Sequence, residues 1–564
     1  METLQDLVAS LEGKDGVALS SKHGGWTYPE LYRDVVSFSG SFLAMGYTPG
    51  DRVAVVADNP VGWLPVSLGL SNAGLVDVPL PTGTPRKELE VILEHSGARS
   101  VVAEKPGLVE GLGVDVIPFS EESFESLRTG SSQPLPEVSP GDTASIIYTS
   151  GTTGAPKGVE LSHGNFMSNC VACLDFMDLD ENDKFLSILP AWHAFERMAK
   201  YVALASGAGT FYTTQRDIFT DLKEQQPTIM ASVPRIWRRV YDSAHDKLQK
   251  KLDGSSFARL AFKLAPGMVY KRMGKELHEA LGGRFRYAIS GGSRLSLDVD
   301  EFFRRVGIEV LEGYGLTETS PVVTGRRPGS FAVGTAGPPL KDVEVEVRDP
   351  ESGEPLGPGE QGLIYVSGPN VMKGYHKNLE ATEKAFSYDG GKRWLDTGDL
   401  GSLDEHGRLS VTARQKEIIP LQNGENVNPN RIEDALLKSP YVRQAFVTGS
   451  DEWKAPGVLL VPDYDRVKEY CRSHGVAFKD GDDASLASNP AVEKLFSREL
   501  KAYVNHGNGF RPHELVRRWH FLEKPFEVGE ELTRTLKLKR DAIVEKYRGL
   551  IDDLYERVHG HRNA

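Results

Sequence analysis

Residues 148–158, YTSGTTGAPKG, combine three glycines, four serine or threonine residues and one lysine after an apolar stretch. Closely spaced glycines let backbone N–H groups approach phosphate oxygens, the hydroxyls add donors, and Lys157 adds positive charge. Gly154 is followed by Ala-Pro-Lys, so this is not the Walker pattern. A turn of this composition alone is more often a plain loop, but the complete string is far more specific for phosphate binding.

Seven further segments bear on the same chemistry. They are LPAWHAFER (189–197), ISGGSRLS (289–296), GYGLTET (313–319), WLDTGDLG (394–401), ARQKEII (413–419), NGENVNPNRIED (423–434) and LTRTLKLKR (532–540). Together with the loop they resemble the adenylate-forming superfamily, which includes acyl-CoA synthetases, luciferases and peptide-synthetase adenylation domains. The resemblance covers nearly the whole chain. It implies that an acid is activated by ATP and Mg²⁺ through an acyl-adenylate.

The resemblance also implies the nucleotide contacts. Tyr314 is expected to stack on adenine, Thr317 to bond the α-phosphate and Glu318 to ligate Mg²⁺. Asp399 is expected to receive both ribose hydroxyls, because a carboxylate offers several lone-pair sites to two donors. Arg414 resembles the second ribose contact. The remaining residues expected to bind ATP or AMP are Thr149, Ser150, Gly151, Thr152, Thr153, Lys157, Gly292, Ser293, Gly313 and Gly315.

Lys537 resembles the mobile catalytic lysine of the family's C-terminal domain. When a carboxylate attacks the α-phosphate, two anions meet, so a positive charge at that place stabilises the transition state. A lysine in a basic run is ordinarily a solvated surface charge. Its place relative to the other motifs favours Lys537, and Lys539 is the alternative register. Lys416 resembles the hinge about which family members rotate the C-terminal domain between two half-reactions.

Two segments favour a long-chain fatty acid as the substrate. VPRIW (233–237) resembles the long-chain signature, in which Trp237 corresponds to an aromatic gate on the acyl tunnel, although a tryptophan at a helix start is equally often core. LPAWHAFER, which contains His193, resembles the corresponding run of long-chain enzymes. Its Trp-His pair is similar to the acyl–acyl-carrier-protein synthetases of cyanobacteria and plastids. The acceptor thiol is therefore coenzyme A or the phosphopantetheine of an acyl carrier protein, with coenzyme A favoured.

Two other functions fit parts of this pattern. A non-catalytic acyl- or nucleotide-binding relative is disfavoured because Glu318, Asp399 and Lys537 are all present. An enzyme that stops at the acyl-adenylate, or that uses a luciferase-type second step, stays open. Arg294 replaces a residue that is usually small or proline near the adenine, which bears on the local geometry there.

The elements that must position these residues follow from hydrophobic patterning. RVAVVAD (52–58), LVDVPL (75–80) and SVVAEK (100–105) predict buried strands separated by helices, and hence a parallel sheet. Alternation in 343–349 and 362–368 predicts a smaller β-rich subdomain. We therefore expect an α/β protein with a large N-terminal adenylation domain of stacked α/β subdomains (1–413), a hinge (414–416) and a small mobile α/β C-terminal domain (417–564).

Composition limits the class of protein further. Sixty-six basic and 79 acidic residues leave a net charge of −13, which disfavours a nucleic-acid partner. Three cysteines argue against a disulfide framework, and the Cys170–Cys173 spacing is interpreted as two buried helical residues. No signal peptide or membrane-spanning run is apparent. The expected location is cytoplasmic, with peripheral contact at the inner face of a membrane left open, and the oligomeric state is not predicted.

Overall fold

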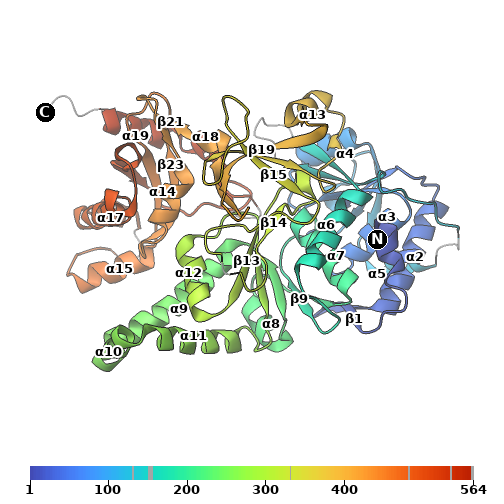
Figure 1. Ribbon diagram of the computed structural model, residues 1–564, viewed down its shortest axis with the longest axis horizontal. Helices are drawn as coiled ribbons and strands as arrows, with labels where there is room; N and C mark the ends of the chain where they lie inside the picture. Colours follow the sequence, from blue (N-terminus) through green and yellow to red (C-terminus); the bar gives the residue numbers. More distant parts are fainter. Residues whose placement is uncertain (130–132, 150–155, 331, 480–482, 534–536, 560–564) are drawn as a thin grey trace. The chain divides into compact units, whose positions relative to one another are not determined.

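The chain folds into two compact units. The computed structural model describes residues 1–129, 133–149, 156–330, 332–479, 483–533 and 537–559 (Figure 1). Unit 1 comprises Met1–Thr397 and Gly401–Val411, and unit 2 comprises Gly398–Leu400 and Thr412–Ala564. Each unit contains both helices and strands, which confirms the predicted α/β class.

The strands predicted near the amino terminus form the centre of a seven-stranded sheet with the order β17-β8-β7-β4-β3-β5-β6. The five strands from β7 to β6 are parallel, as the alternation of strands and helices indicates. β8 and β17 are antiparallel additions at one edge. The bounds are β3 (Arg52–Val56), β4 (Val76–Leu80), β5 (Ala98–Ala103), β6 (Asp115–Pro118), β7 (Thr143–Thr149), β8 (Lys157–Ser162) and β17 (Gly374–Tyr375).

A second sheet of eight strands has the order β14-β13-β12-β11-β9-β10-β1-β2. Its six inner strands, β13 through β1, are parallel, and β14 and β2 pair antiparallel at the two edges. The bounds are β1 (Val17–Ser21), β2 (Gly24–Thr27), β9 (Lys184–Ser187), β10 (Gly209–Tyr212), β11 (Ile229–Ser232), β12 (Tyr287–Ser290), β13 (Glu309–Tyr314) and β14 (Thr324–Gly325).

Helices cover both sheets of unit 1. α6 and α7 lie side by side, and their apolar faces share one core with α2, α3 and residues of both sheets (Figure 1). α6 begins in a capping box, in which Ser162 and Asn165 satisfy each other's backbone N–H groups. The helices are α1 (Leu4–Ala9), α2 (Tyr28–Ala44), α3 (Trp63–Asn72), α4 (Arg86–Ser96), α5 (Glu121–Arg128), α6 (His163–Phe176), α7 (Ala194–Ser206), α8 (Ile218–Gln225), α9 (Pro234–Gly254), α10 (Ser256–Leu264), α11 (Pro266–Ala280), α12 (Leu297–Val306) and α13 (Leu379–Ala385).

A fully buried ion pair fastens α7 to the seven-stranded sheet. Arg197 of α7 and Asp77 of β4 are both wholly inaccessible to solvent, and their closest N–O distance is 2.6 Å. The guanidinium also donates to the hydroxyls of Ser67, Ser145 and Tyr201 at 2.6–3.1 Å. All five of its N–H groups therefore have acceptors, which is the condition under which a buried charge is tolerated.

The predicted β-rich subdomain is a five-stranded sheet in which β15, β16, β19 and β18 are neighbours and β20 pairs with β19. The stretches expected to alternate correspond to its first two strands. The bounds are β15 (Glu344–Arg348), β16 (Gly362–Ser367), β18 (Phe386–Asp389), β19 (Lys392–Leu403) and β20 (Leu409–Arg414). The boundary between the two units passes through β19 and β20.

Unit 2 has its own sheet and its own apolar core. β23 and β24 pair antiparallel, β25 joins β24 in parallel, and β21 pairs with β22. The strands are β21 (Ile419–Pro420), β22 (Asn426–Val427), β23 (Val442–Thr448), β24 (Gly457–Pro462) and β25 (Arg518–Phe521). The helices are α14 (Pro429–Leu436), α15 (Tyr464–Ser473), α16 (Asp483–Ala487), α17 (Pro490–Tyr503), α18 (Arg540–Lys546) and α19 (Arg548–His559).

The three cysteines are free thiols. Cys170 and Cys173 lie buried on α6, and burial raises the pKa of Cys173 to about 12, so its thiolate is strongly disfavoured. Within the part of the chain that the structure describes, no helix combines the length and apolar character needed to cross a membrane.

His163, the first residue of α6, lies fully buried beside the amino-terminal helix. Its Nδ1 accepts the Leu4 N–H at 3.3 Å. Burial lowers the pKa of His163 from 6.5 to about 4, because the charged imidazolium would lose its hydration. Between about pH 6.5 and pH 4 the unfolded chain therefore binds a proton that the folded chain does not.

The stability of unit 1 should consequently fall as the pH is lowered from 6.5 to 4. The full linkage contribution of a shift of this size is about 3 kcal/mol. Thermal unfolding midpoints of the wild type and of His163→Asn, measured across this range, provide the test. Asparagine keeps an acceptor near Nδ1 but does not titrate, so its midpoint should fall less steeply. Parallel curves for the two proteins would contradict the assignment.

Candidate active site

Several predicted site residues of unit 1 follow the parallel strands of the eight-stranded sheet. β9, β11, β12 and β13 run in one direction, so their carboxyl ends lie along a common edge, which is where open α/β sheets bind ligands. The chain leaving β9 reaches His193, and the chain leaving β11 enters α9 with Trp237. The loop after β12 carries Gly292 and Ser293, and Tyr314 ends β13.

The ends of β12 and β13 are joined by a buried glutamate that sequence reasoning missed. Glu312 accepts the Leu295 N–H at 3.0 Å and an N–H of Arg326 at 2.9 Å. Arg326 also forms a buried ion pair with Asp300 of α12 at 2.6 Å. Burial raises the pKa of Glu312 to about 7, although Arg326 opposes the rise. This network fixes the loop after β12 against the start of the 313–319 segment.

Gly292 and Ser293 are exposed in that loop. Gly292 has a φ of +81°, a left-handed conformation that glycine adopts without strain. Tyr314 is half-buried on the adjacent strand, and Ser290 and Glu312, two residues before Gly292 and Tyr314, are direct partners in the pairing of the two strands. The structure thus brings Gly292 and Tyr314 to neighbouring strand ends, and their contact with adenine stays a prediction.

The turn that carries Thr317 and Glu318 is held by backbone contacts. It is a short 3₁₀ helix, Thr317–Thr319, and the Thr319 hydroxyl donates to the backbone carbonyl oxygens of Leu316 and Pro321, each at 3.0 Å. The Asn370 side chain donates to the Thr319 carbonyl oxygen at 3.0 Å. Thr317 and Glu318 remain half-exposed, so their side chains are accessible to a ligand.

Gly315 permits the close approach on which this turn depends. A Cβ atom at Gly315 would lie 1.7 Å from the Pro321 carbonyl oxygen, which belongs to the backbone and cannot rotate away. The equivalent atom at Gly313 would meet its nearest neighbour, the Thr324 carbonyl oxygen, at 3.4 Å, an ordinary van der Waals distance. The two glycines of GYG therefore differ: only Gly315 is required by space.

Glu318 is linked to Lys157 through a tyrosine that sequence reasoning did not identify. The Tyr375 hydroxyl donates to Glu318 Oε1 at 3.1 Å, and Lys157 Nζ lies 4.8 Å from the centre of the same ring. β17, which ends at Tyr375, pairs with β8, which begins at Lys157. The backbone N–H of Met372 donates to the Glu318 carbonyl oxygen at 2.8 Å. One cation and one carboxylate predicted to act on phosphates are thereby brought together.

Only part of the predicted phosphate loop lies in the described structure. Thr149 ends β7 and is paired in register with Lys157, which opens β8. Both side chains are half-buried. The described residues do not include four predicted members of this loop: Ser150, Gly151, Thr152 and Thr153. The structure therefore gives the position of the loop only through Thr149 and Lys157.

His193 caps the amino end of α7. Its Nδ1 accepts the Phe195 N–H at 3.2 Å, and a Cβ on Gly291 would approach the Phe195 ring at 3.0 Å. The amino end of α7 therefore packs against the loop that follows β12. The part of His193 in an acyl tunnel stays a prediction.

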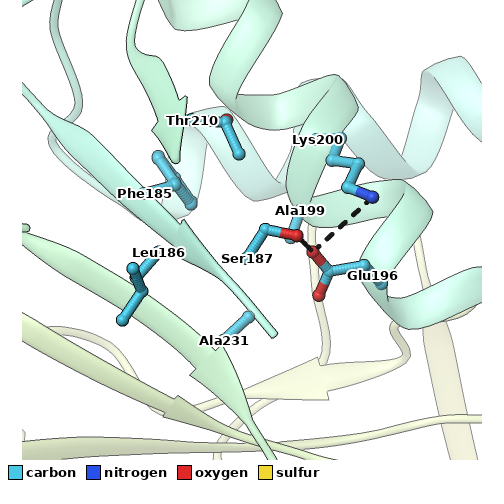
Figure 2. Close-up of a pocket in the computed structure, with 8 residues that line it drawn as sticks. All are labelled: Phe185, Leu186, Ser187, Glu196, Ala199, Lys200, Thr210 and Ala231. Carbon is cyan, nitrogen blue, oxygen red and sulfur yellow. Dashed lines mark hydrogen bonds and ion pairs between the residues drawn. The ribbon is translucent and has the colours of Figure 1, made fainter. Parts of the chain in front are cut away.

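One turn further along, α7 carries a buried ion pair, Glu196 with Lys200 (Figure 2). Their closest atoms are 3.8 Å apart, Ser187 bonds the Glu196 carboxylate, and Lys200 donates to Asn59 at 2.9 Å. The pair borders a cavity of about 10 Å³, the lower limit for one water molecule. Burial lowers the pKa of Lys200 to about 8 and raises that of Glu196.

Trp237 is fully enclosed near the start of α9. Its ring meets Phe303 edge-on, with centroids 5.7 Å apart, and it lies 6.2 Å from Phe285. These residues belong to an apolar cluster with α12 and the neighbouring strands. This environment suits a core residue, and the gate function of Trp237 stays a prediction.

In unit 2, the predicted ribose-binding pair and the predicted catalytic lysine are close together. Arg414 Nε lies 3.1 Å from Asp399 Oδ1, and the carboxylate is almost fully buried. Lys537 keeps exposed surface, yet desolvation and then the Arg414 charge lower its pKa, whereas Asp399 and Glu417 act to raise it. The protonation of Lys537 therefore depends on the charges of Arg414, Asp399 and Glu417. Lys416 is exposed in a short 3₁₀ helix, Gln415–Glu417.

A second arginine anchors the segment that bears Lys537. Arg540 donates to both carboxylate oxygens of Glu433 on α14, at 2.8 and 3.0 Å, and to Asn430 at 2.7 Å. Its Nε also lies 3.7 Å from Glu417. Three residues after Lys537, the chain is therefore fastened to α14 and to the segment that follows Arg414.

Comparisons with known proteins give consistent results. Residues 9–376 match the family model of the AMP-binding enzyme, and residues 416–559 match that of the AMP-binding enzyme C-terminal domain. A peroxisomal long chain acyl-CoA synthetase 7 from Arabidopsis thaliana is 30% identical, over 94% of this chain and 82% of its own. A chloroplastic long-chain-fatty-acid–[acyl-carrier-protein] ligase from the same plant is 29% identical, with the same coverage.

Among solved structures, the ATP-bound MatB of Rhodopseudomonas palustris is similar to this chain with a TM-score of 0.75 and 25% identity. The similarity covers 97% of this chain and 99% of that one. The arrangement of elements in both units is thus one already known to accommodate ATP.

Gly315→Ala should destabilise unit 1, because the backbone at Pro321 must move to admit the methyl group. Overpacking of this kind costs about 1–3 kcal/mol. Gly313→Ala is the matched control, since its methyl group fits without a clash, and it should change stability by less. Chemical unfolding followed by tryptophan fluorescence compares the two. Equal effects, or a larger effect at Gly313, would show that the close approach at Gly315 does not constrain the turn.

Proposed function

The chain belongs to the AMP-binding enzyme family, on its long-chain acyl-CoA synthetase branch, and from this premise we propose that it activates a long-chain fatty acid. In the proposed reaction, ATP and the fatty acid give an acyl-adenylate and diphosphate. The acyl group then passes to the thiol of coenzyme A, with release of AMP.

The observation that carries this proposal is the meeting of Glu318, Tyr375 and Lys157. The Glu318 carboxylate and the Lys157 ammonium group both contact the Tyr375 side chain, although they come from two segments of the chain. Both groups could therefore act on the same bound triphosphate, the carboxylate through Mg²⁺ and the ammonium group directly. Mg²⁺ prefers oxygen ligands and usually takes only one or two carboxylates besides phosphate oxygens. Half-exposed Glu318 fits that role, and across the described ranges no three potential metal-binding side chains form a cluster. Bound Mg²⁺ would supply positive charge to the phosphates.

In the first half-reaction, a carboxylate oxygen of the fatty acid forms a bond to the α-phosphorus. The bond between that phosphorus and the bridging oxygen breaks, and diphosphate leaves. Thr317 would donate to the α-phosphate, while Tyr314 and the loop with Gly292 and Ser293 would hold the adenine. Asp399 and Arg414 would bind the ribose. Lys537 would neutralise the charge that accumulates as the two anions meet.

In the second half-reaction, the thiol sulfur forms a bond to the acyl carbonyl carbon, loses its proton, and AMP leaves. This step needs no cation between two anions, so Lys537 is dispensable in it. We propose that residues 417–564 move about a hinge at 414–416 between the half-reactions, with Lys416 as the hinge residue. One active site would thereby catalyse adenylation first and thioester formation second.

An acyl carrier protein is a second candidate for the molecule that accepts the acyl group. The plastid relative named for that acceptor is as similar to this chain as the relative named for coenzyme A. Both acceptors present a phosphopantetheine thiol, so one thiol site would accept either. They differ in size and surface charge, which product analysis can distinguish.

Product analysis tests the proposed function directly. With ATP and Mg²⁺, kcat/KM should rise steeply from butyrate to palmitate. Each buried methylene contributes roughly 0.8 kcal/mol of transfer free energy, and palmitate has about twelve more methylenes than butyrate. If one-third of that free energy is realised, the difference is around 3 kcal/mol, which corresponds to a more than hundredfold difference in kcat/KM. Mass spectrometry should detect the thioester with coenzyme A. A flat profile would reject the long-chain assignment, and thioester with carrier protein alone would select the second candidate.

Lys537→Ala should reduce adenylation by about a hundredfold or more, a loss typical of one electrostatic stabiliser. Thioester formation from supplied acyl-adenylate should change far less. Lys539→Ala is the matched control, since its ammonium donates to the Gly529 carbonyl oxygen at 2.9 Å, and it should leave both steps nearly unchanged. Diphosphate release and thioester formation are measured separately. Equal losses in the two steps of Lys537→Ala would contradict this role.

A further inference from the structure

The short helix α10 presents large apolar side chains to solvent. Phe257, Leu260 and Leu264, spaced by three and four residues, lie on one face of the helix and are 80%, 53% and 74% exposed. Met268, at the start of α11, is 71% exposed. Isolated exposed apolar residues need no explanation, but four bulky ones within twelve positions mark an interaction surface. We refer to these four residues as the α10 apolar face.

This face is not part of the core. The opposite side of α10 holds it to α11: Phe262 is half-buried, and its ring lies 5.9 Å from that of Tyr270. In Figure 1, α10 lies at the outer end of α9 and α11. The helix is therefore positioned by one side and leaves the α10 apolar face uncovered.

Basic residues are frequent in the segment that carries the face, although the whole chain is acidic. Residues 247–275 contain eight lysines and arginines and one aspartate, while the complete chain has a net charge of −13. All nine side chains are exposed. An exposed apolar face flanked by lysine and arginine is the pattern of helices that lie in the interface of an anionic membrane.

We propose that α10 and the start of α11 dock this protein on a membrane surface that contains anionic phospholipids. The α10 apolar face would enter the acyl boundary, and Lys250, Arg259, Lys263 and Lys271 would meet the head groups. The chain as a whole carries a net charge of −13, so the positive charge of this segment is a local feature. The inference rests on the surface itself and holds whether or not the proposed reaction is correct.

A bilayer fits this surface better than a second copy of the chain. A symmetric contact between two copies would place the same lysines and arginines against each other, and like charges repel. A bilayer supplies anionic groups and apolar depth together. An acidic protein would satisfy the charges but would also need a groove for three bulky side chains on a short helix.

Sedimentation of the full-length protein with lipid vesicles tests the proposal. The protein should bind vesicles of equimolar phosphatidylcholine and phosphatidylglycerol, more weakly at high salt, and bind pure phosphatidylcholine much less. Leu264→Ser should weaken binding to the mixed vesicles by roughly tenfold, the low end for burial of one leucine. Combined replacement of Lys250, Arg259 and Lys263 by glutamate should abolish the preference for anionic lipid.

Leu379→Ser is the matched control, because Leu379 on α13 is 72% exposed but lies outside the segment. It should leave vesicle binding unchanged, and circular dichroism should show that all variants are folded. Binding that Leu264→Ser does not weaken, or that is equal on both kinds of vesicle, would overturn the proposal. So would sedimentation equilibrium showing self-association that Leu264→Ser disrupts, or binding of an acidic carrier protein in place of lipid by this face.

Discussion

Unit 1 depends on one geometric constraint: parallel strands deliver their carboxyl ends to the same edge of a sheet. β9, β11, β12 and β13 obey it, and Gly292, Ser293 and Tyr314 lie at that edge. Strand order, not sequence distance, therefore decides which side chains become neighbours. Gly292 and Tyr314 are 22 positions apart in the chain, yet they occupy adjacent strand ends.

The edge alone is not sufficient, because Lys157, the cation predicted to contact phosphate, belongs to β8 of the seven-stranded sheet. α7 connects the two: Arg197 fixes it to β4 of the seven-stranded sheet, and Phe195 at its amino end packs on the loop after β12. The turn at Glu318 makes the other connection, through Tyr375 and Met372 beside β8. Two independent links hold the sheets in one arrangement, which suits a site that must bind a long, charged nucleotide.

Hydrophobic patterning was sufficient to predict the strands at 52–58, 75–80 and 100–105, since buried parallel strands are continuous apolar runs. The resemblance supplied residues whose motifs are contiguous, including Thr317 and Glu318. It assigned no role to Glu312, Tyr375 or Arg540, whose importance arises from partners up to 123 positions away. A lone glutamate, tyrosine or arginine carries no periodic or spacing signal, so only the tertiary structure reveals such a residue.

Trp237 illustrates the opposite difficulty. The sequence interpretation gave a gate and a core residue equal weight, and the structure encloses the side chain between aromatic rings. A core tryptophan and a closed gate make the same contacts. They differ in whether the Trp237 side chain moves when the substrate binds.

The buried Arg197–Asp77 pair has a consequence for how this chain can change over generations. Removing either partner alone leaves an uncompensated charge in the interior, at a cost of about 3–5 kcal/mol, a large share of the stability of most domains. Replacing both by well-packed apolar residues could be harmless, but that route requires two simultaneous substitutions, with three hydroxyl partners left to rearrange. Whether Arg197 or Asp77 is lost first, the intermediate protein is destabilised by a buried unpaired charge. The pair would therefore persist during neutral evolution even where it is not needed for function.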